Sequence, residues 1–189
     1  MQKVVIIEDF YEAQDFGIMS NFALTCSLKG LYVPHNIYYP SRLQAYPTWE
    51  CNFFTEKEMP YQIFKNTLKR KTHLNPIKID SSFRKVLTSE LEQSPYKGRE
   101  ESLIHQDSSE YDWAGVVYFD SFCIKDGTRI YSYREQVEPD IIVGSKPNRC
   151  VLFKADLFHS AAIDWRRDSR LIQLFFLKEG IDAKNNGTN

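Results

Sequence analysis

The chain has 189 residues, of which 42% are hydrophobic and 14% aromatic, a length and composition that favour one compact domain over disorder. The formal net charge of −1 excludes the strongly basic field of a typical nucleic-acid-binding domain. No stretch approaches the roughly 20 apolar residues of a membrane helix, and the first residues lack the long apolar region of a signal peptide. We therefore expect a cytoplasmic protein that binds neither nucleic acid nor membrane.

The first half of the chain is predicted to combine helical stretches with loops. Residues 10–31 favour helical stretches that break near Gly17 and end near Gly30, because glycine weakens a helix interior and commonly ends a helix. Residues 32–62 are rich in proline and aromatic residues, which indicates an extended, loop-rich region. Residues 61–70 suit a short helix.

The second half changes to short apolar or alternating runs, separated by turn-like pairs such as Asp126-Gly127 and Pro147-Asn148. Together with the first apolar run of the chain, the predicted strands are residues 4–7, 82–88, 102–105, 114–119, 129–133, 141–143, 150–153 and 171–177. Many short strands at this spacing are typical of a β-sandwich or barrel. The expected fold class is α+β, with N-terminal helices packed on one sheet of a β-sandwich.

His105 and Asp107 form the first candidate for a metal site. In a strand, side chains at positions i and i+2 point to the same face, so these two side chains can converge on one ion. A neutral imidazole nitrogen and a carboxylate oxygen are both good ligands for Fe(II), Mn(II) or Zn(II). A His-x-Asp pair is nevertheless common, and taken alone this one is more typical of a surface loop.

His159 is the second candidate, because it follows a buried run through a short turn. It lies 52 residues after Asp107, which leaves room for four more strands and for the chain to return beside the His-x-Asp pair. Taken alone, His159 is more typical of a hydrogen-bonded core histidine. The site therefore depends on the three residues coming together.

Arg170 opens the apolar run 171–177, where strand alternation places it on the face of Ile172. A buried guanidinium group is costly without an anionic partner, and it binds carboxylates bidentately. The partner is either the carboxylate of a bound ligand or a nearby aspartate, Asp164 or Asp168. The neighbouring Arg166 and Arg167 are expected to be solvated.

The order and spacing of these residues resemble a known family. A His-x-Asp pair, a histidine about fifty residues later and an arginine at the start of an apolar strand together resemble the 2-oxoglutarate/Fe(II)-dependent oxygenases, and most closely their prolyl-4-hydroxylase-like branch. Residues 113–120, 126–131 and 153–161 add to this likeness. Two departures stand out: Asp126 replaces a glycine of the family's Gly-Gly-Thr turn, and Ile172 replaces a frequent serine.

The resemblance implies the fold and its boundaries. It implies a double-stranded β-helix, or jelly-roll, core over about residues 80–178. This core belongs to a single oxygenase-like domain of residues 1–183, and residues 184–189 are expected to form a flexible tail.

The resemblance also implies the chemistry. Fe(II) is expected to be bound by His105, Asp107 and His159, the catalytic centre, as a facial triad of two histidines and one carboxylate. Arg170 is expected to bind the distal carboxylate of 2-oxoglutarate, helped by the hydroxyl group of Tyr118. In the family, O2 and 2-oxoglutarate are converted to succinate and carbon dioxide while a substrate C–H bond is oxidised, usually by hydroxylation.

The substrate is the least defined part of the expectation. Tyr96 and Arg99 precede the His-x-Asp pair and are candidates to line the substrate pocket, although a loop tyrosine and a solvated arginine fit them equally well. The expected substrate is a small molecule or a peptide, and a homodimer is one state that the sequence allows. The alternative reading is a cupin-like metal-binding jelly-roll protein that acts differently or has no catalytic activity.

Overall fold

The structure is a computed structural model that describes residues 3–28, 33–34, 48–50, 54–88, 104–120 and 122–180. In chain order the described elements are β1 (Val4–Ile7), α1 (Ala13–Leu28), β2 (Val33–Pro34), β3 (Thr48–Glu50), α3 (Met59–Thr72), β4 (Pro76–Leu87), β5 (Trp113–Tyr118), β6 (Cys123–Tyr131), β7 (Ile141–Ser145), β8 (Cys150–Lys154), β9 (Phe158–Ala162) and β10 (Ser169–Glu179).

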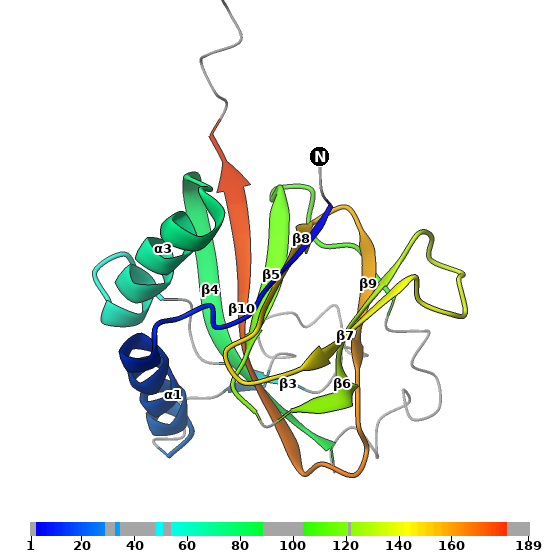
Figure 1. Ribbon diagram of the computed structural model, residues 1–189, viewed down its shortest axis with the longest axis horizontal. Coiled ribbons are helices and arrows are strands. Elements are labelled where there is room, and N and C mark those ends of the chain that lie inside the picture. Colours follow the sequence, from blue (N-terminus) through cyan, green and yellow to red (C-terminus); the bar gives the residue numbers. More distant parts are fainter. Residues whose placement is uncertain are drawn as a thin grey trace, which may run out of the picture.

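The described strands form two antiparallel sheets that face each other, with helices α1 and α3 on the outer side of the larger one (Figure 1). The larger sheet has seven strands in the order β1-β8-β5-β10-β4-β3-β2. The smaller sheet has three strands in the order β7-β6-β9. This arrangement is an α+β fold with a jelly-roll core, as expected from the sequence.

The larger sheet is buried on both faces, and strand alternation separates two cores. On strand β10, Phe175 and Leu177 pack toward the helices, whereas Ile172 packs between the sheets. Gly115 allows one close approach on β5, because a Cβ atom there would lie 2.4 Å from the Phe175 ring. The buried core between the sheets is made of Ala114, Val116, Tyr118, Ile130, Val143, Val151, Phe153, Ala155 and Ile172.

The helix break expected at Gly17 is wrong, because helix α1 runs through this residue without interruption. An isolated glycine costs a helix only about 1 kcal/mol relative to alanine. Met19 and Ala23 are fully buried in the core under the helices, and Phe16 stacks on Phe119 with ring centroids 5.4 Å apart. This packing outweighs the glycine penalty.

Helix α3 is longer than the predicted residues 61–70 and begins inside the region predicted as loop. Pro60 stands in its first turn, where the missing N–H group costs nothing and the fixed φ angle suits a helix. The helix ends at His73, whose left-handed φ of 60° lets its N–H group donate to the Lys69 carbonyl. Strands β2 and β3 also lie in the predicted loop region.

Most predicted strands are confirmed, several with longer bounds, and three details are wrong. The run 102–105 is no ladder strand over its described part: His105 forms a single bridge with His159, and residues 102–103 lie outside the described residues. His159 does follow a short turn after the buried run, as predicted, but it sits on strand β9, which the sequence did not predict. The Asp126-Gly127 pair is not a turn, because it lies within β6 at a break in the register with β7.

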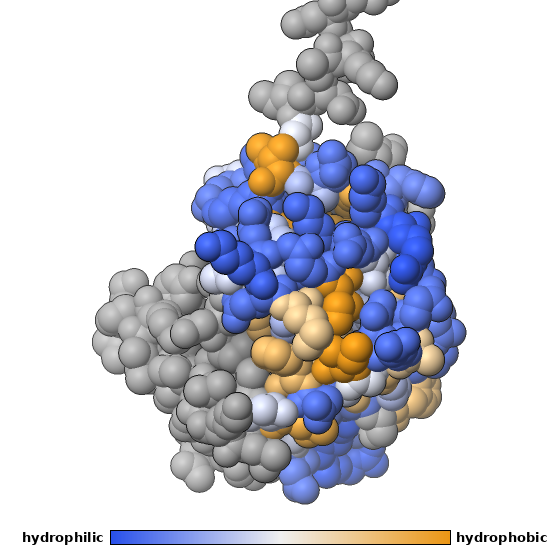
Figure 2. Space-filling view, turned by 90° about the vertical axis from the view of Figure 1, so that its left-hand side faces the viewer, coloured by the Kyte–Doolittle hydropathy of each residue, from blue (hydrophilic) through white to orange (hydrophobic). Residues whose placement is uncertain are grey.

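The helix-bearing side is mostly hydrophilic, with a smaller apolar patch (Figure 2). Large apolar side chains that stay exposed on the helices include Leu24 of α1 and Met59 of α3. Within the described residues, no helix is both long and apolar enough to cross a bilayer. The expected tail, residues 184–189, lies outside the described residues.

Candidate metal centre and anion site

The His-x-Asp segment is held against β9 by backbone hydrogen bonds. His105 and His159 exchange a pair of them, with N···O distances of 3.0 and 2.9 Å. The Asp107 N–H group donates to the Ala155 carbonyl at 3.1 Å, and the Gln106 side chain donates to the Asp156 carbonyl. An extended segment thus presents both side chains to one place, as the i, i+2 argument requires, without a full strand ladder.

His159 reaches the same place from β9. It pairs with Ile130 across the β6–β9 ladder, and opposite residues in antiparallel strands share a face, so its side chain points between the sheets. Its ring lies 4.6 Å from the Phe153 ring. The Leu157 carbonyl lies 3.0 Å from its Nδ1 atom, which can therefore donate a proton and leave the Nε2 lone pair for an ion.

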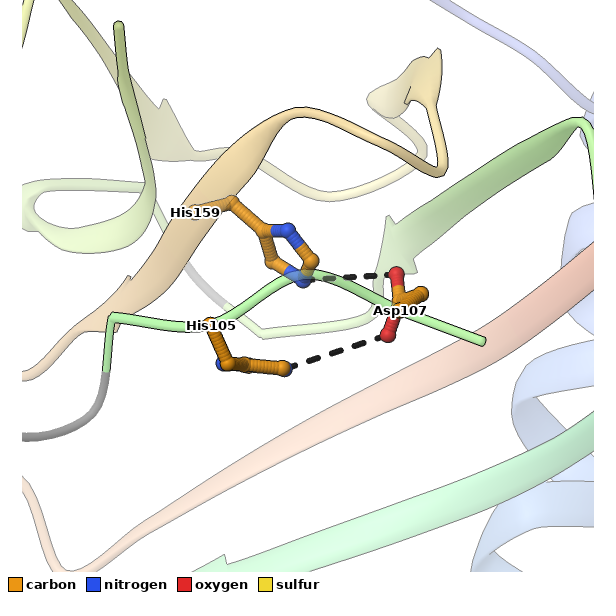
Figure 3. Close-up of side chains that lie close together, drawn as sticks. All are labelled: His105, Asp107 and His159. Carbon is orange, nitrogen blue, oxygen red and sulfur yellow. Dashed lines mark ion pairs between the residues drawn. The ribbon is translucent and has the colours of Figure 1, made fainter. Parts of the chain in front are cut away.

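The three side chains converge (Figure 3). The Asp107 carboxylate lies beside the two rings, which are 4.3 Å apart between centroids, and its oxygens are 3.4 Å from His159 Nε2 and 3.8 Å from His105 Nε2. The side chain of His105 is 55% exposed, whereas those of Asp107 and His159 are 12% and 10% exposed. The site is thus open to solvent on the His105 side and walled on the other.

The donor set suits a divalent transition metal. One ligand atom from each residue lies within 4.8 Å of the other two. Ligands about 2.0–2.2 Å from a metal lie up to about 4.4 Å apart, so small side-chain rotations suffice to bind one ion. Burial lowers the pKa of His159 to about 4, against the opposing effect of the Asp107 charge, so the imidazole is neutral and ready to coordinate at neutral pH.

Arg170 lies between the sheets, as alternation predicted, and only 6% of it is exposed. Its guanidinium carbon lies 5.5 Å from the centre of the Tyr118 ring, and its Nη1 atom donates to the Ala162 carbonyl at 3.4 Å. The Tyr118 hydroxyl is buried and hydrogen-bonded to the Thr128 hydroxyl at 2.6 Å. His105, Asp107 and His159 are hereafter the metal-type cluster. Because Ala162 and His159 both belong to β9, this one strand contacts Arg170 and also contributes to the metal-type cluster.

The anionic partner of Arg170 differs from both aspartates considered in the sequence. Among the described residues it is Asp126 of β6, whose Oδ1 lies 3.5 Å from Arg170 Nε, whereas Asp164 pairs with Arg166 at 2.8 Å. The expectation that Arg167 is solvated is also wrong, because its side chain is 19% exposed and lies 3.3 Å from Asp126. A register break in β6, not sequence proximity, brings Asp126 to the arginines.

Two buried carboxyl groups share these arginines. Arg167 also lies 3.8 Å from Asp120, which accepts a hydrogen bond from the Leu171 N–H group. Burial raises the pKa of both Asp120 and Asp126, while the neighbouring guanidinium groups act in the opposite direction. Asp120, Asp126, Arg167 and Arg170 are hereafter the ion-pair cluster.

The other residues that the sequence offered as candidates do not join either cluster within the described residues. Tyr96 and Arg99 lie outside the described residues. Trp113, at the start of β5, is 5% exposed and packs in the core under the helices. Sequence reasoning missed the roles of Thr128 and Asp126, although their place in the Gly-Gly-Thr-like segment was a signal for both.

Comparisons with known proteins agree with the fold. No family model matches the chain, and no curated protein matches it by sequence. Among solved structures, a Pseudomonas putida prolyl-4-hydroxylase is similar over 95% of this chain and 94% of its own, with 13% identity and a TM-score of 0.66. The α-ketoglutarate-dependent epimerase SnoN from nogalamycin biosynthesis is similar over 99% of this chain and 87% of its own, with 10% identity and a TM-score of 0.61.

A third structure extends the likeness. A Trichoplax adhaerens prolyl hydroxylase, solved with a peptide fragment of hypoxia inducible factor, is similar over 94% of this chain and 84% of its own, with 11% identity and a TM-score of 0.59. The chain therefore has the fold of the non-haem 2-oxoglutarate-dependent oxygenases. Two of these three structures are prolyl hydroxylases, the branch that the sequence resembles.

Proposed function

We propose that this chain is an Fe(II)- and 2-oxoglutarate-dependent dioxygenase. The overall reaction converts R–H, O2 and 2-oxoglutarate to R–OH, succinate and carbon dioxide, so that one oxygen atom enters each organic product. The observation that carries the proposal is a His-Asp-His cluster with its ligand atoms within 4.8 Å, in a jelly roll whose strand β9 also reaches a buried arginine.

The proposed metal ligands are His105, Asp107 and His159. When bound, Fe(II) and 2-oxoglutarate supply the oxygen activation that the side chains cannot perform. The Leu157 carbonyl orients the His159 ring by accepting its Nδ1 proton, and the Ala155 carbonyl holds the Asp107 backbone. These supports hold two ligands before an ion arrives, which reduces the cost of ordering them.

Arg170 is the proposed partner of the distal carboxylate of 2-oxoglutarate. Its burial keeps water from competing for the guanidinium group, and a charged hydrogen bond is stronger in such surroundings. Tyr118 and Thr128 offer two hydroxyl groups beside it. We keep Tyr118 as a second contact to the cosubstrate and Tyr96 and Arg99 as substrate-lining residues.

The first test is spectroscopic and needs no substrate. Anaerobic addition of Fe(II) and 2-oxoglutarate should give the weak visible charge-transfer band of the chelate at roughly 500 nm. His105→Ala should lose the band together with metal affinity. A wild-type protein that shows no band and binds metal no better than His105→Ala would overturn the proposal.

The second test separates cosubstrate binding from metal binding. Arg170→Leu should bind Fe(II) like wild type and lose 2-oxoglutarate affinity, because it removes the proposed carboxylate partner and leaves the three metal ligands in place. Unchanged 2-oxoglutarate affinity in Arg170→Leu would remove Arg170 from the site. Metal binding with no 2-oxoglutarate binding in wild type would favour the cupin-like alternative.

A substrate screen completes the proposal. Succinate formation from 2-oxoglutarate should rise when the right substrate is present, because decarboxylation is coupled to substrate oxidation. The panel should hold prolyl peptides and polycyclic small molecules, since solved structures of this fold contain a peptide fragment in one case and nogalamycin RO in another. An inactive His159→Ala protein is the control for metal-independent turnover.

A further inference from the structure

Asp126 places a negative charge where the proposed cosubstrate needs a positive one. The Asp126 carboxylate lies 3.5 Å from Arg170 Nε, and the two side chains are 3% and 7% exposed. Gly127 makes this placement feasible, because β6 passes so close to β7 that a Cβ atom there would lie 1.9 Å from the Val143 carbonyl oxygen. The guanidinium group proposed to bind a ligand carboxylate therefore already faces an internal one.

Among the described residues, two carboxylates and two guanidinium groups already lie together here before any ligand arrives. Arg170 approaches it from β10, and Arg167 from the segment between β9 and β10 at 3.3 Å. Asp120, between β5 and β6, lies 3.8 Å from Arg167 and is the second carboxylate of the ion-pair cluster. In the part of the chain that the structure describes, the other charged or titratable groups that face Asp126 are Asp164, which pairs with Arg166 and accepts from Cys123, and Tyr118 of β5.

A third carboxylate would leave this buried cluster with one excess negative charge. Two carboxylates that share one buried cation repel each other, and a proton on one of them removes the repulsion. The metal-binding carboxylate of 2-oxoglutarate has its own counter-ion, but the distal one shares Arg170 with Asp126. Protonation of Asp126 is the change that keeps the cluster neutral without breaking the fold.

We infer that Asp126 competes with the distal carboxylate of 2-oxoglutarate for Arg170, so that the cosubstrate binds together with one proton, taken up by the Asp126 carboxyl group. This inference rests on the proposed function. It makes Asp126 a residue that sets cosubstrate affinity. It also predicts how the affinity for 2-oxoglutarate changes with pH. Binding is tightest at low pH and weakens as the pH rises above the pKa that Asp126 has in the ligand-free protein.

The surroundings of Asp126 favour this exchange. Burial raises the pKa of its carboxyl group, and removing Arg170 to a ligand carboxylate would raise it further. Linkage then requires proton uptake between the pKa values of the free and the bound protein, and a loss of affinity of about tenfold for each pH unit across that interval.

The test is calorimetric titration of 2-oxoglutarate into protein preloaded with Mn(II). The titration is repeated from pH 6 to 8.5 in two buffers with different ionisation enthalpies, which counts the protons bound per ligand. Wild type should take up a proton fraction that approaches one, with affinity falling as the pH rises. Binding with no proton uptake across this range would overturn the inference and leave the proposed function standing.

Two variants assign the proton. Asp126→Asn should bind 2-oxoglutarate without proton uptake, with an affinity that is independent of pH and at least about tenfold tighter than that of wild type at the upper end of the range. Asp164→Asn is the matched control, because its carboxylate pairs with Arg166 instead, and it should keep the wild-type uptake and slope.

The other possible results of these titrations also test the assignment of the proton to Asp126. Proton uptake that persists in Asp126→Asn, or disappears equally in Asp164→Asn, overturns the assignment to Asp126. If Asp126→Asn does not fold, the proton count of wild type still decides, because zero uptake contradicts the exchange. Absence of 2-oxoglutarate binding by Mn(II)-loaded wild type and Asp126→Asn at every pH would overturn the proposed function itself.

Discussion

The metal-type cluster and the ion-pair cluster lie in the same jelly roll but differ in their exposure to solvent and in how their charges are paired. His105, Asp107 and His159 come from an extended segment and a strand joined by one bridge, and His105 is largely exposed. The ion-pair cluster is buried, and among the described residues it holds two carboxylates and two guanidinium groups. The first cluster is open to solvent, whereas the second is closed and pairs its described charges with one another.

This difference in exposure and charge pairing predicts that a cation binds at the metal-type cluster more easily than an anion binds at Arg170. An ion that enters the metal-type cluster finds a carboxylate and a neutral imidazole held by backbone carbonyls. An anion that approaches Arg170 must first displace or neutralise Asp126, since burying an unmatched charge is costly. Changes at the first cluster should therefore affect function most, and changes at the second should affect stability as well.

The largest effect is expected from His159→Ala. It removes the buried metal ligand, so Mn(II) affinity should fall more than about 100-fold, beyond the 10–100-fold that loss of a supporting hydrogen bond costs. Titration calorimetry with Mn(II) measures it. His73→Asn is the control, because His73 is a left-handed helix cap that asparagine tolerates, and it should bind Mn(II) like wild type. Equal affinity in the two variants would contradict the metal site.

The second effect concerns stability at the ion-pair cluster. Arg170→Leu leaves Asp126 with Arg167 alone, so unfolding free energy should fall by about 3 kcal/mol, the lower end of the range for a broken buried pair. Urea denaturation measures the change. The Asp126→Asn/Arg170→Leu double variant should recover most of it. A single variant as stable as wild type would show that the cluster is not a closed electrostatic unit.

The third effect separates the two clusters. Gly127→Ala forces a Cβ atom against the Val143 carbonyl, where backbone must move, so stability should fall by roughly 1–3 kcal/mol. Mn(II) affinity should stay at the wild-type value, because the metal-type cluster lies on other segments. Thermal unfolding and Mn(II) titration give the two numbers. Loss of metal affinity in the folded variant would mean that the clusters are coupled.

The smallest effect is expected at a surface ion pair. Lys146 lies 2.8 Å from Glu8, with side chains 42% and 43% exposed. Solvent and salt screen such a pair, so Lys146→Ala should change unfolding free energy by no more than about 0.5 kcal/mol. The same urea experiment measures it. A change as large as that of Arg170→Leu would remove the contrast between buried and exposed pairs.

Much of the site was readable from local patterns. Alternation predicted that Arg170 would face the core between the sheets, and the structure places it there. His159 lies 52 residues after Asp107, which left room for four strands, and β5 to β8 lie in that interval. The convergence of the three candidate ligands was an expectation that the geometry meets.

The misses share a physical cause. The break expected at Gly17 failed because packing of α1 on the sheet outweighs a penalty of about 1 kcal/mol. Strand β9 was missed because its residues form a strand only through pairing with β6 and the bridge to His105. Local propensity carries no information about such partners.

The sequence by itself determined the donor types, their order and, in the strands that it predicted, which residues share a face, because these follow from chemistry and from a period of two. Tertiary structure alone decided which charges meet. Asp126 lies 44 residues before Arg170 in the chain, and only the register break of β6 and its close approach to β7 bring the two together. Long-range pairing therefore set the electrostatics around Arg170.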